Sequence, residues 1–305
     1  MKAEGVVLEG TGGVWKVRTT EGAEHLTSMR GRLKQEEKIK LAVGDHVTIE
    51  QDDAGDSWAI TTIKERTSRL ARRAPGGRYA ERVIVANLDQ VVVVFAAANP
   101  EPHAGMIDRF LVIAESNDLA VRLVVNKCEL TDPSVVDTLM KPYADAGYEI
   151  HRTSVKTGQG IAELHDMLAG RVSALTGPSG VGKSSLLNAI FPGVNLRVGE
   201  ISESVNKGRH TTVGAKLVPL PENGFVVDTP GLREVGLWGI SSDDVDQCFP
   251  EIRERIGTCR FRDCVHDGEP GCAIREAVAA GEISSARHQS YLKLREELAE
   301  SENVY

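Results

Sequence analysis

The first 63 residues alternate apolar and polar positions in short runs that turn signals separate. The runs GVVLEG, VWKVRTT, DHVTIEQ and SWAITTI are separated by TGG, VGD and DAGD. Alternation with a period of two is typical of half-buried antiparallel strands. The pattern predicts a small antiparallel β-barrel, and periodicity does not distinguish an OB-type barrel from an SH3-like one.

From about Val83 the pattern changes to continuous apolar runs that alternate with helical stripes. The predicted strands are QVVVVFAAA, VRLVVN, YEIHRTS, VSALTG and FVVDTP. Between them, apolar residues recur at helical spacing over residues 106–114 and 161–168, a pattern that core packing explains. This alternation predicts an α/β domain with a parallel sheet.

After about Gly236 the sheet pattern ends. A cysteine-rich loop follows, and residues 284–300 form a charged run for which we expect an exposed helix. The predicted organisation is a β-barrel over residues 1–66, a basic linker over 67–82, the α/β domain over 83–235 and a small, mainly helical domain over 236–305.

Length and composition agree with a multidomain soluble protein. The chain has 305 residues, 41% hydrophobic and 26% charged, whereas single cores rarely grow past about 250 residues. The apolar run at residues 91–98 is far shorter than the roughly 18 residues of a membrane helix. With no signal peptide in the N-terminal pattern, we expect a cytoplasmic protein.

Charge is distributed unevenly along the chain. The net charge of −8 argues against indiscriminate binding of nucleic acid. In the predicted linker region we favour contact with RNA or phosphate over a merely solvated segment. For the basic loop Met29–Lys34, nucleic-acid contact and a solvated turn are equally compatible. The positive residues of the linker region are Lys64, Arg66, Arg69, Arg72, Arg73, Arg78 and Arg82.

A phosphate-binding motif, GPSGVGKS, follows the predicted strand VSALT and precedes SLLNAI. This strand–loop–helix context is the one that a P-loop requires. Backbone N–H groups would contact phosphate oxygens, Lys183 would neutralise their charge, and Ser184 would ligate magnesium. The predicted nucleotide-binding residues of this loop are Gly177, Pro178, Ser179, Gly180, Val181, Gly182, Lys183, Ser184 and Ser185.

A second phosphate motif, DTPG, follows the predicted strand FVVD. Asp228 at the strand end would hold magnesium through water, and Gly231 would offer its N–H to the γ-phosphate. Alone, such a motif is weak evidence for a nucleotide site. One strand after a P-loop, it supports that assignment.

Two further strand ends carry motifs that look like the guanine-recognition sequences N-K-x-D and S-A-K of GTPases. Asn126 and Lys127 end one strand, and Ser154, Val155 and Lys156 follow the next. Glu129 stands at the acid position, which would pair with guanine N1 and its amine. The extra methylene keeps the charge but moves it by about 1.5 Å. GTP preference is therefore expected, and an ATPase with a chance N-K match is the alternative that ATP competition would reveal.

The order of these motifs is unusual. Ordinary GTPases carry the P-loop first and the base motifs last, whereas here the base motifs precede Gly177. A circular permutation preserves the site because the termini of a compact domain are often close. The segment after DTPG then leads directly into the C-terminal domain, which nucleotide state could move.

Four metal-ligand residues lie within fourteen positions in the pattern C-x4-C-x-H-x5-C. Cysteine and histidine in this number favour tetrahedral structural zinc, and four protein ligands leave no open position for catalysis. We expect Cys128 and Cys248 to be ordinary thiols. The predicted zinc ligands are Cys259, Cys264, His266 and Cys272.

The complete motif order resembles the RsgA family (also called YjeQ or YloQ) of ribosome small-subunit-dependent GTPases over nearly the whole chain. It comprises the base motifs, the P-loop, KGRHTT at Lys207–Thr212, DTPGLRE and CRFRDCVHDGEPGC. The resemblance implies an OB-type barrel, a circularly permuted P-loop GTPase domain and a zinc domain. It also implies a monomer that contacts ribosomal RNA late in small-subunit assembly.

The hydrolytic machinery departs from the common GTPase pattern. Leu232 occupies the position where many GTPases have a water-orienting glutamine. We therefore expect slow intrinsic turnover, with the missing group supplied by His210, by Arg209 or by a rearrangement on the ribosome. Similarity to the family makes His210 a candidate, and a surface histidine is the competing interpretation. Magnesium coordination would be completed by Thr211 or Thr212.

The predicted function is a GTPase that hydrolyses GTP to GDP and phosphate, slowly alone and faster on the small subunit. The alternative is an RNA-binding assembly factor that senses guanine nucleotides and in which hydrolysis is incidental. A variant that binds GTP without hydrolysing it would distinguish them, because a two-state switch requires different affinities in its two nucleotide states.

Overall fold

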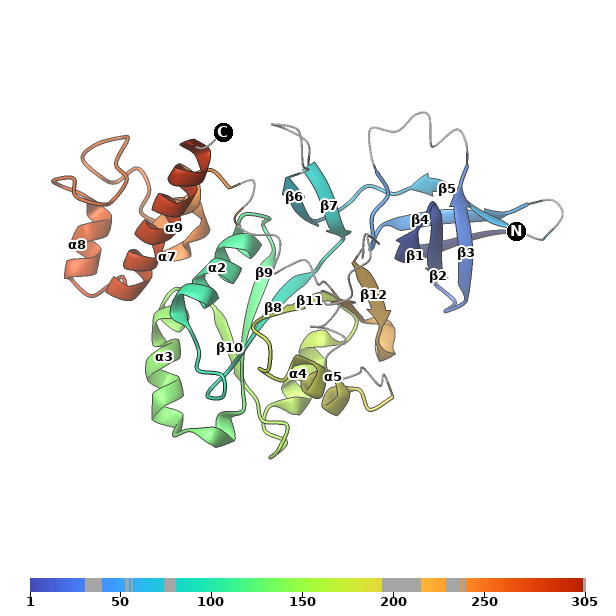
Figure 1. Cartoon of the computed structure of the whole chain (residues 1–305), viewed down its shortest axis with the longest axis horizontal. Helices are drawn as coiled ribbons and strands as arrows, with labels where there is room; N and C mark the ends of the chain where they lie inside the picture. The colour runs from blue at the N-terminus through green and yellow to red at the C-terminus, as the bar shows by residue number, and fades with distance from the viewer. Residues whose placement is uncertain are drawn as a thin grey trace.

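Three parts follow one another along the molecule, as Figure 1 shows: a β-barrel, a central α/β domain and a helical C-terminal part. The computed structural model describes residues 1–30, 40–52, 55, 57–73, 81–193, 215–228, 237 and 240–303. The predicted fold classes of all three parts are confirmed.

The N-terminal strands close into a barrel in the order β1-β2-β3-β5-β4, with β3 parallel to β5. This is the order of an OB-type barrel. Strand β3 was not predicted, because its sequence EHLTSM is weakly apolar. Buried Val7, Val17, Val47, Ile49 and Ile60 fill the interior. The strands are β1 Lys2–Thr11, β2 Val14–Thr19, β3 Glu24–Met29, β4 His46–Gln51 and β5 Trp58–Ile63.

The segment predicted as an irregular basic linker contains a strand. β6 (Arg69–Arg73) pairs antiparallel with β7 (Glu81–Ala86). Arg66, one of the residues predicted to contact RNA, places its Nε 2.7 Å from Oδ1 of the fully buried Asp45. A buried carboxylate needs such a partner, so this arginine stabilises the barrel.

The central sheet has the order β10-β9-β8-β11-β13-β12. Its predicted strands are all confirmed. The four-residue strand β12 was not predicted, and it runs antiparallel to β13 while the remaining neighbours are parallel. The strands are β8 Gln90–Ala96, β9 Ala120–Asn126, β10 Glu149–Arg152, β11 Val172–Thr176, β12 Lys216–Pro219 and β13 Phe225–Asp228.

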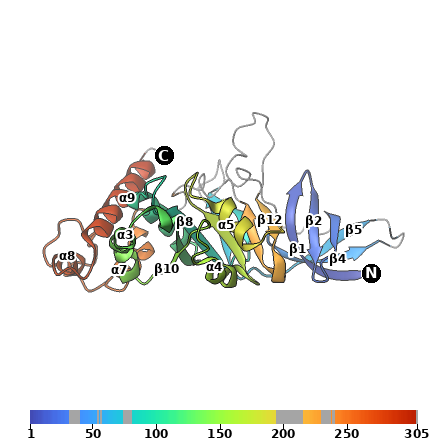
Figure 2. The ribbon, with the colours of Figure 1, turned by 90° about the horizontal axis from the view of Figure 1, so that it is seen from below.

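Helices cover both faces of this sheet. Alternate residues of β8 pack on opposite sides: Val91 and Val93 join the core under α2 (Ala104–Glu115) and α3 (Pro133–Asp145). Val92 and Val94 join the core under α4 (Ile161–Leu168) and α5 (Lys183–Ile190). At the far edge β12 borders the barrel (Figures 1 and 2), where Lys216 Nζ lies 3.5 Å from a carboxylate oxygen of Glu9.

The C-terminal part packs on α2 through its last helix and through η4 (Val245–Cys248). The prediction of an exposed helix here was wrong for one face, because Arg287, His288, Tyr291, Leu294 and Leu298 are buried. The charged sequence did not indicate a buried face, because Arg287 is buried together with the carboxylates of Asp108 and Glu251. The elements are η4 Val245–Cys248, α7 Pro250–Arg253, α8 Ala273–Ala279 and α9 Ser285–Asn303. Among the residues described, no helix is long and apolar enough to cross a membrane.

Candidate nucleotide site and metal centre

The predicted nucleotide motifs gather at one edge of the central sheet. Strands β9, β10, β11 and β13 run parallel, so their carboxyl ends meet there. Asn126 is the last residue of β9, Ser154 follows β10, Gly177 follows β11 and Asp228 ends β13. Ligands of open α/β sheets bind at this edge.

The glycine loop between β11 and α5 depends on its lack of side chains. Gly177, Gly180 and Gly182 all have positive φ, at +136°, +79° and +96°. A Cβ at Gly177 would lie 2.0 Å from the carbonyl oxygen of Val94. Only glycine fits that approach, and the loop is thereby held against the end of β8.

Lys183 lies inside this loop. Its side chain is buried, and Nζ donates to the carbonyl oxygens of Gly177 at 3.0 Å and Pro178 at 2.8 Å. Ser184 follows it in the first turn of α5 and is also buried. A buried ammonium group beside a helix N-terminus favours a polyphosphate.

The first base-recognition motif is bonded directly to the P-loop. Asn126 Nδ2 donates to the carbonyl oxygen of Val181 at 2.8 Å, and Lys127 Nζ donates to that of Gly180 at 2.7 Å. Lys127 also donates to the backbone carbonyl of Asn99, a residue that no sequence motif indicated. These hydrogen bonds therefore fix the position of the first base-recognition loop relative to the P-loop.

The second base-recognition loop lies against the acid of the first. The Ser154 hydroxyl, by hydrogen bonding, holds the pKa of Glu129 below its ordinary value, and Lys156 and Lys127 add to this shift. Glu129 is therefore ionised at neutral pH. Its Oε2 atom is buried and has no hydrogen-bond partner. Because a buried acceptor gains from a donor, this atom is available to an N–H group of a ligand.

Several predicted site residues lie outside the described residues: Gly231 and the candidates His210, Thr211 and Thr212, together with Arg209 and Leu232. Their roles in magnesium binding and catalysis stay predictions. Val155 and Lys156 follow Ser154 in the second base-recognition loop, and both are exposed.

Replacing Gly182 by alanine is expected to weaken guanine-nucleotide binding about tenfold or more, since strain of this kind costs about 1–3 kcal/mol. The new Cβ would lie 2.5 Å from Asn126 Nδ2, at a φ of +96°. Titration calorimetry with GDP measures the change.

Gly180→Ala is the matched control for this variant. Its φ of +79° is strained as well, but the nearest heavy atom, Pro100 Cδ, would be 3.9 Å from the new Cβ. Equal loss of affinity in both variants would show that displacement of Asn126 is not the cause.

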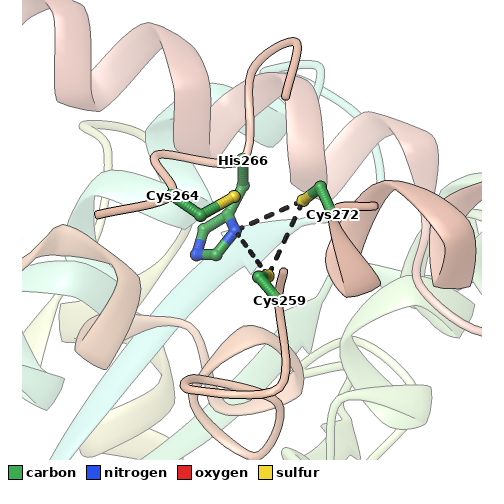
Figure 3. A group of neighbouring side chains, drawn as sticks. All are labelled: Cys259, Cys264, His266 and Cys272. Carbon is green, nitrogen blue, oxygen red and sulfur yellow. Dashed lines mark hydrogen bonds between the residues drawn. The ribbon is translucent and has the colours of Figure 1, made fainter. Parts of the chain in front are cut away.

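The predicted zinc ligands converge on one point in the C-terminal part (Figure 3). The Sγ atoms of Cys259 and Cys272 are 3.9 Å apart, and His266 Nδ1 lies 3.6 Å and 3.4 Å from them. With bonds of about 2.3 Å to sulfur and 2.0 Å to nitrogen, tetrahedral zinc needs separations of about 3.8 Å and 3.5 Å. The ligand atoms, including Cys264 Sγ, all lie within 4.8 Å of one another, so the residues fit such an ion.

The loop that carries these ligands is held by a carboxylate. Glu269 accepts hydrogen bonds from the backbone N–H groups of Val265 at 2.7 Å, Asp267 at 3.0 Å and Gly268 at 3.0 Å. Burial opposes its ionisation, but these amides more than compensate and lower the pKa of Glu269 to about 2. Burial also lowers the pKa of His266, which favours the neutral imidazole that a metal binds.

Comparison with known proteins gives matches over nearly the whole chain. The model of the RsgA GTPase family matches residues 63–238, and the model of the RsgA N-terminal domain matches residues 4–59. A small ribosomal subunit biogenesis GTPase RsgA from Gemmatimonas aurantiaca is 60% identical over 96% of this chain and 97% of its own. The protein of that name from Moorella thermoacetica is 40% identical over 99% of both chains.

Two solved structures are similar in fold and sequence. YjeQ from Thermotoga maritima superposes with a TM-score of 0.82 at 36% identity, covering 98% of this chain and 99% of its own. YloQ, described as a circularly permuted GTPase, superposes with a TM-score of 0.77 at 29% identity, covering 99% and 96%.

Proposed function

Because this chain belongs to the RsgA GTPase family, we propose that it binds the small ribosomal subunit and assists its late maturation. In this proposal it hydrolyses GTP slowly alone and faster on the subunit. The carrying observation is that both base-recognition loops and the P-loop lie at the carboxyl ends of parallel strands in one sheet, and that Asn126 and Lys127 are hydrogen-bonded to the P-loop. Relatives at up to 60% identity are named for small-subunit biogenesis.

In the proposed site the P-loop amides and Lys183 bind the phosphates. Ser184 and Asp228, with Thr211 or Thr212, hold the magnesium ion that accompanies GTP. That ion neutralises charge on the β- and γ-phosphates. Of these residues, Lys183 already lies buried within the loop, donating to two of its carbonyl oxygens.

Glu129 is proposed to select guanine. Its buried, unpartnered Oε2 atom would accept from guanine N1 or the exocyclic amine, whereas adenine presents no such pair of donors. The glutamate thus serves in the position where related motifs have aspartate, and the hydrogen bond from Ser154 lowers its pKa.

Glu129→Gln is expected to lower GTP affinity roughly 10–100-fold, since a charge-assisted hydrogen bond is worth about 1.5–3 kcal/mol. The carboxamide gains a donor, so xanthosine triphosphate, which has an acceptor in place of the guanine amine, should bind relatively better. Competition of both nucleotides for one fluorescent GDP analogue measures the preference. The exposed Glu163→Gln on α4 is the matched control, and an unchanged preference in Glu129→Gln would contradict the assignment.

Leu232 gives the proposed enzyme no side chain that can orient the attacking water. We propose that His210, or a group contributed on the subunit, supplies this function. Low turnover by the free protein then follows from the sequence, and binding to the subunit raises it by completing the site.

The experiment that tests the proposal measures hydrolysis of GTP and ATP by the purified chain, with and without small ribosomal subunits. Subunits are expected to increase GTP hydrolysis about tenfold or more, within the range that partner-supplied groups reach. ATP hydrolysis should stay at background, and competition by ATP as strong as by GTP would indicate an ATPase.

Binding of the chain to the subunits is measured in the same samples, by co-sedimentation. Binding without stimulation would favour the second candidate, a guanine-nucleotide-sensing RNA-binding factor. The His210→Ala variant tests the histidine, since unchanged stimulation on the subunit would exclude it as the water-positioning residue.

The remaining proposals follow from the same family membership. The resident metal is zinc, which the donor set of three cysteines and one histidine fits. The protein acts as a monomer on ribosomal RNA in the cytoplasm, where its proposed partner assembles. Metal analysis of the purified chain tests the identity of the metal, and sedimentation tests whether the chain is a monomer.

A further inference from the structure

We propose that the metal loop, residues 259–272, fixes the C-terminal part to the GTPase domain through α9, so that loss of the metal loosens the contact between α9 and α2. The inference concerns what the metal site does for the rest of the chain, and it does not depend on the ribosomal partner.

Two side chains of α9 bind the backbone of the metal loop. His288 Nε2 donates to the carbonyl oxygen of His266 at 2.8 Å, and the Tyr291 hydroxyl donates to that of Val265 at 3.0 Å. Both side chains are buried. One of these carbonyls belongs to His266, a proposed metal ligand. The conformation of the metal loop therefore determines whether His288 and Tyr291 keep these two hydrogen bonds.

The same turn of α9 holds the GTPase domain. Arg287, which is 2% exposed, donates from Nη1 to Oδ1 of Asp108 on α2 at 2.6 Å. Its Nε and Nη2 atoms donate to the two carboxylate oxygens of Glu251 at 2.7 Å and 3.1 Å. The guanidinium carbon lies 4.5 Å from the centroid of the Phe249 ring. The arginine thereby joins α9, α7 and α2 at one buried point.

Other ion pairs across this contact are more exposed. Arg109 of α2 pairs with Glu297 of α9, and Arg253 of α7 pairs with Glu115 of α2 at 3.0 Å. In the first pair the side chains are 38% and 47% exposed, and exposed pairs contribute little. Within the described part of the chain, Arg287 and Asp108 are the pair between α9 and α2 whose charges are both almost fully buried.

Geometry links these two sets of contacts. Arg287, His288 and Tyr291 lie within little more than one helical turn, so displacement of one displaces the others. The ligand loop is short and His266 has a φ of +63°, a conformation that non-glycine residues seldom adopt. A loop with little apolar core depends on its metal for such a fold. When the metal is lost, the Val265 and His266 carbonyls no longer hold their positions, and α9 loses the support that aims Arg287 at Asp108.

Hydrogen–deuterium exchange of the full chain, with the metal and after its removal by a chelator, tests the proposal. We expect metal removal to increase exchange about tenfold in peptides covering α2, residues 104–115, as well as in the metal loop, because helix openings become easier when a packing partner leaves. Peptides of barrel strand β4 should be unchanged and serve as the internal reference.

Two variants separate the steps. Arg287→Lys keeps the positive charge but lacks the planar fork that binds Asp108 and Glu251 through separate nitrogens, so α2 should exchange faster with the metal still bound, and chelation should add little. Tyr291→Phe removes one hydrogen bond to the loop while keeping the ring against Phe249, and should give a smaller increase of the same kind. Metal content is measured for each variant by elemental analysis.

Arg255→Lys is the matched control, since Arg255 pairs with a single exposed carboxylate, Glu282, within the C-terminal part. The proposal is overturned if chelation accelerates exchange only within residues 259–272 and leaves α2 unchanged. It is equally overturned if Arg287→Lys and Arg255→Lys give the same α2 exchange.

Discussion

Replacing Lys183 by alanine is expected to lower the rate of GTP hydrolysis about 10²–10³-fold, the loss typical when one preorganised donor to a developing charge is removed. Lys183 is buried within the P-loop and already donates to the carbonyl oxygens of Gly177 and Pro178. With alanine, no ammonium group faces the β- and γ-phosphates. Single-turnover hydrolysis at saturating GTP measures the chemical step separately from binding.

Lys141→Ala is the control for the loss of a lysine. Lys141 Nζ lies 2.8 Å from a carboxylate oxygen of Asp145, four residues further along α3, and both side chains are exposed. Because this pair lies outside the nucleotide site, hydrolysis should be unchanged. The melting temperature of the Lys183 variant shows whether the fold persists. A folded Lys183→Ala protein with near-normal hydrolysis would mean that the P-loop is not the reacting site.

Replacing Cys272 by serine is expected to weaken metal binding by more than roughly 100-fold, since changes to residues that only support metal ligands already cost 10–100-fold. Cys272 is buried, and its Sγ lies 3.4 Å from His266 Nδ1 and 3.9 Å from Cys259 Sγ. A 100-fold change in affinity corresponds to about 2.7 kcal/mol of stability for the metal-bound fold. Chelator competition gives the affinity, and denaturant unfolding gives the stability.

Cys128→Ser is the control for this prediction. Cys128 is a half-buried thiol outside the cluster whose Sγ contacts the carbonyl oxygen of Val125. The Cys128→Ser protein should bind one metal ion per chain, like the unaltered protein. Full metal content in Cys272→Ser after dialysis would contradict the proposed ligand set.

Much of the fold and of the candidate site was accessible from sequence because its signals are local. The apolar runs of β8 and β9 and the helical stripes of α2 and α4 each lie within one element, so their periodicity was readable. Strand β3 escaped because its sequence is weakly apolar, and β12 escaped because it has four residues. The acid Glu129 was placed by its spacing from Asn126, but its buried, unpartnered oxygen became visible only in the folded chain.

By itself, the sequence determined the P-loop, the candidate base motifs, the permuted order and the cluster of three cysteines and one histidine that could hold a metal ion, since each motif spans few residues and carries its own chemistry. Tertiary structure decided the contacts between distant segments: Asn126 with Val181, 55 residues apart, and Arg287 with Asp108, 179 residues apart. It also decided that Arg287 of α9 is buried and that Arg66 pairs with the buried Asp45. The physical reason is that burial and ion pairing depend on which surfaces meet, and a charged residue is compatible with solvent or with a partner until the chain has folded.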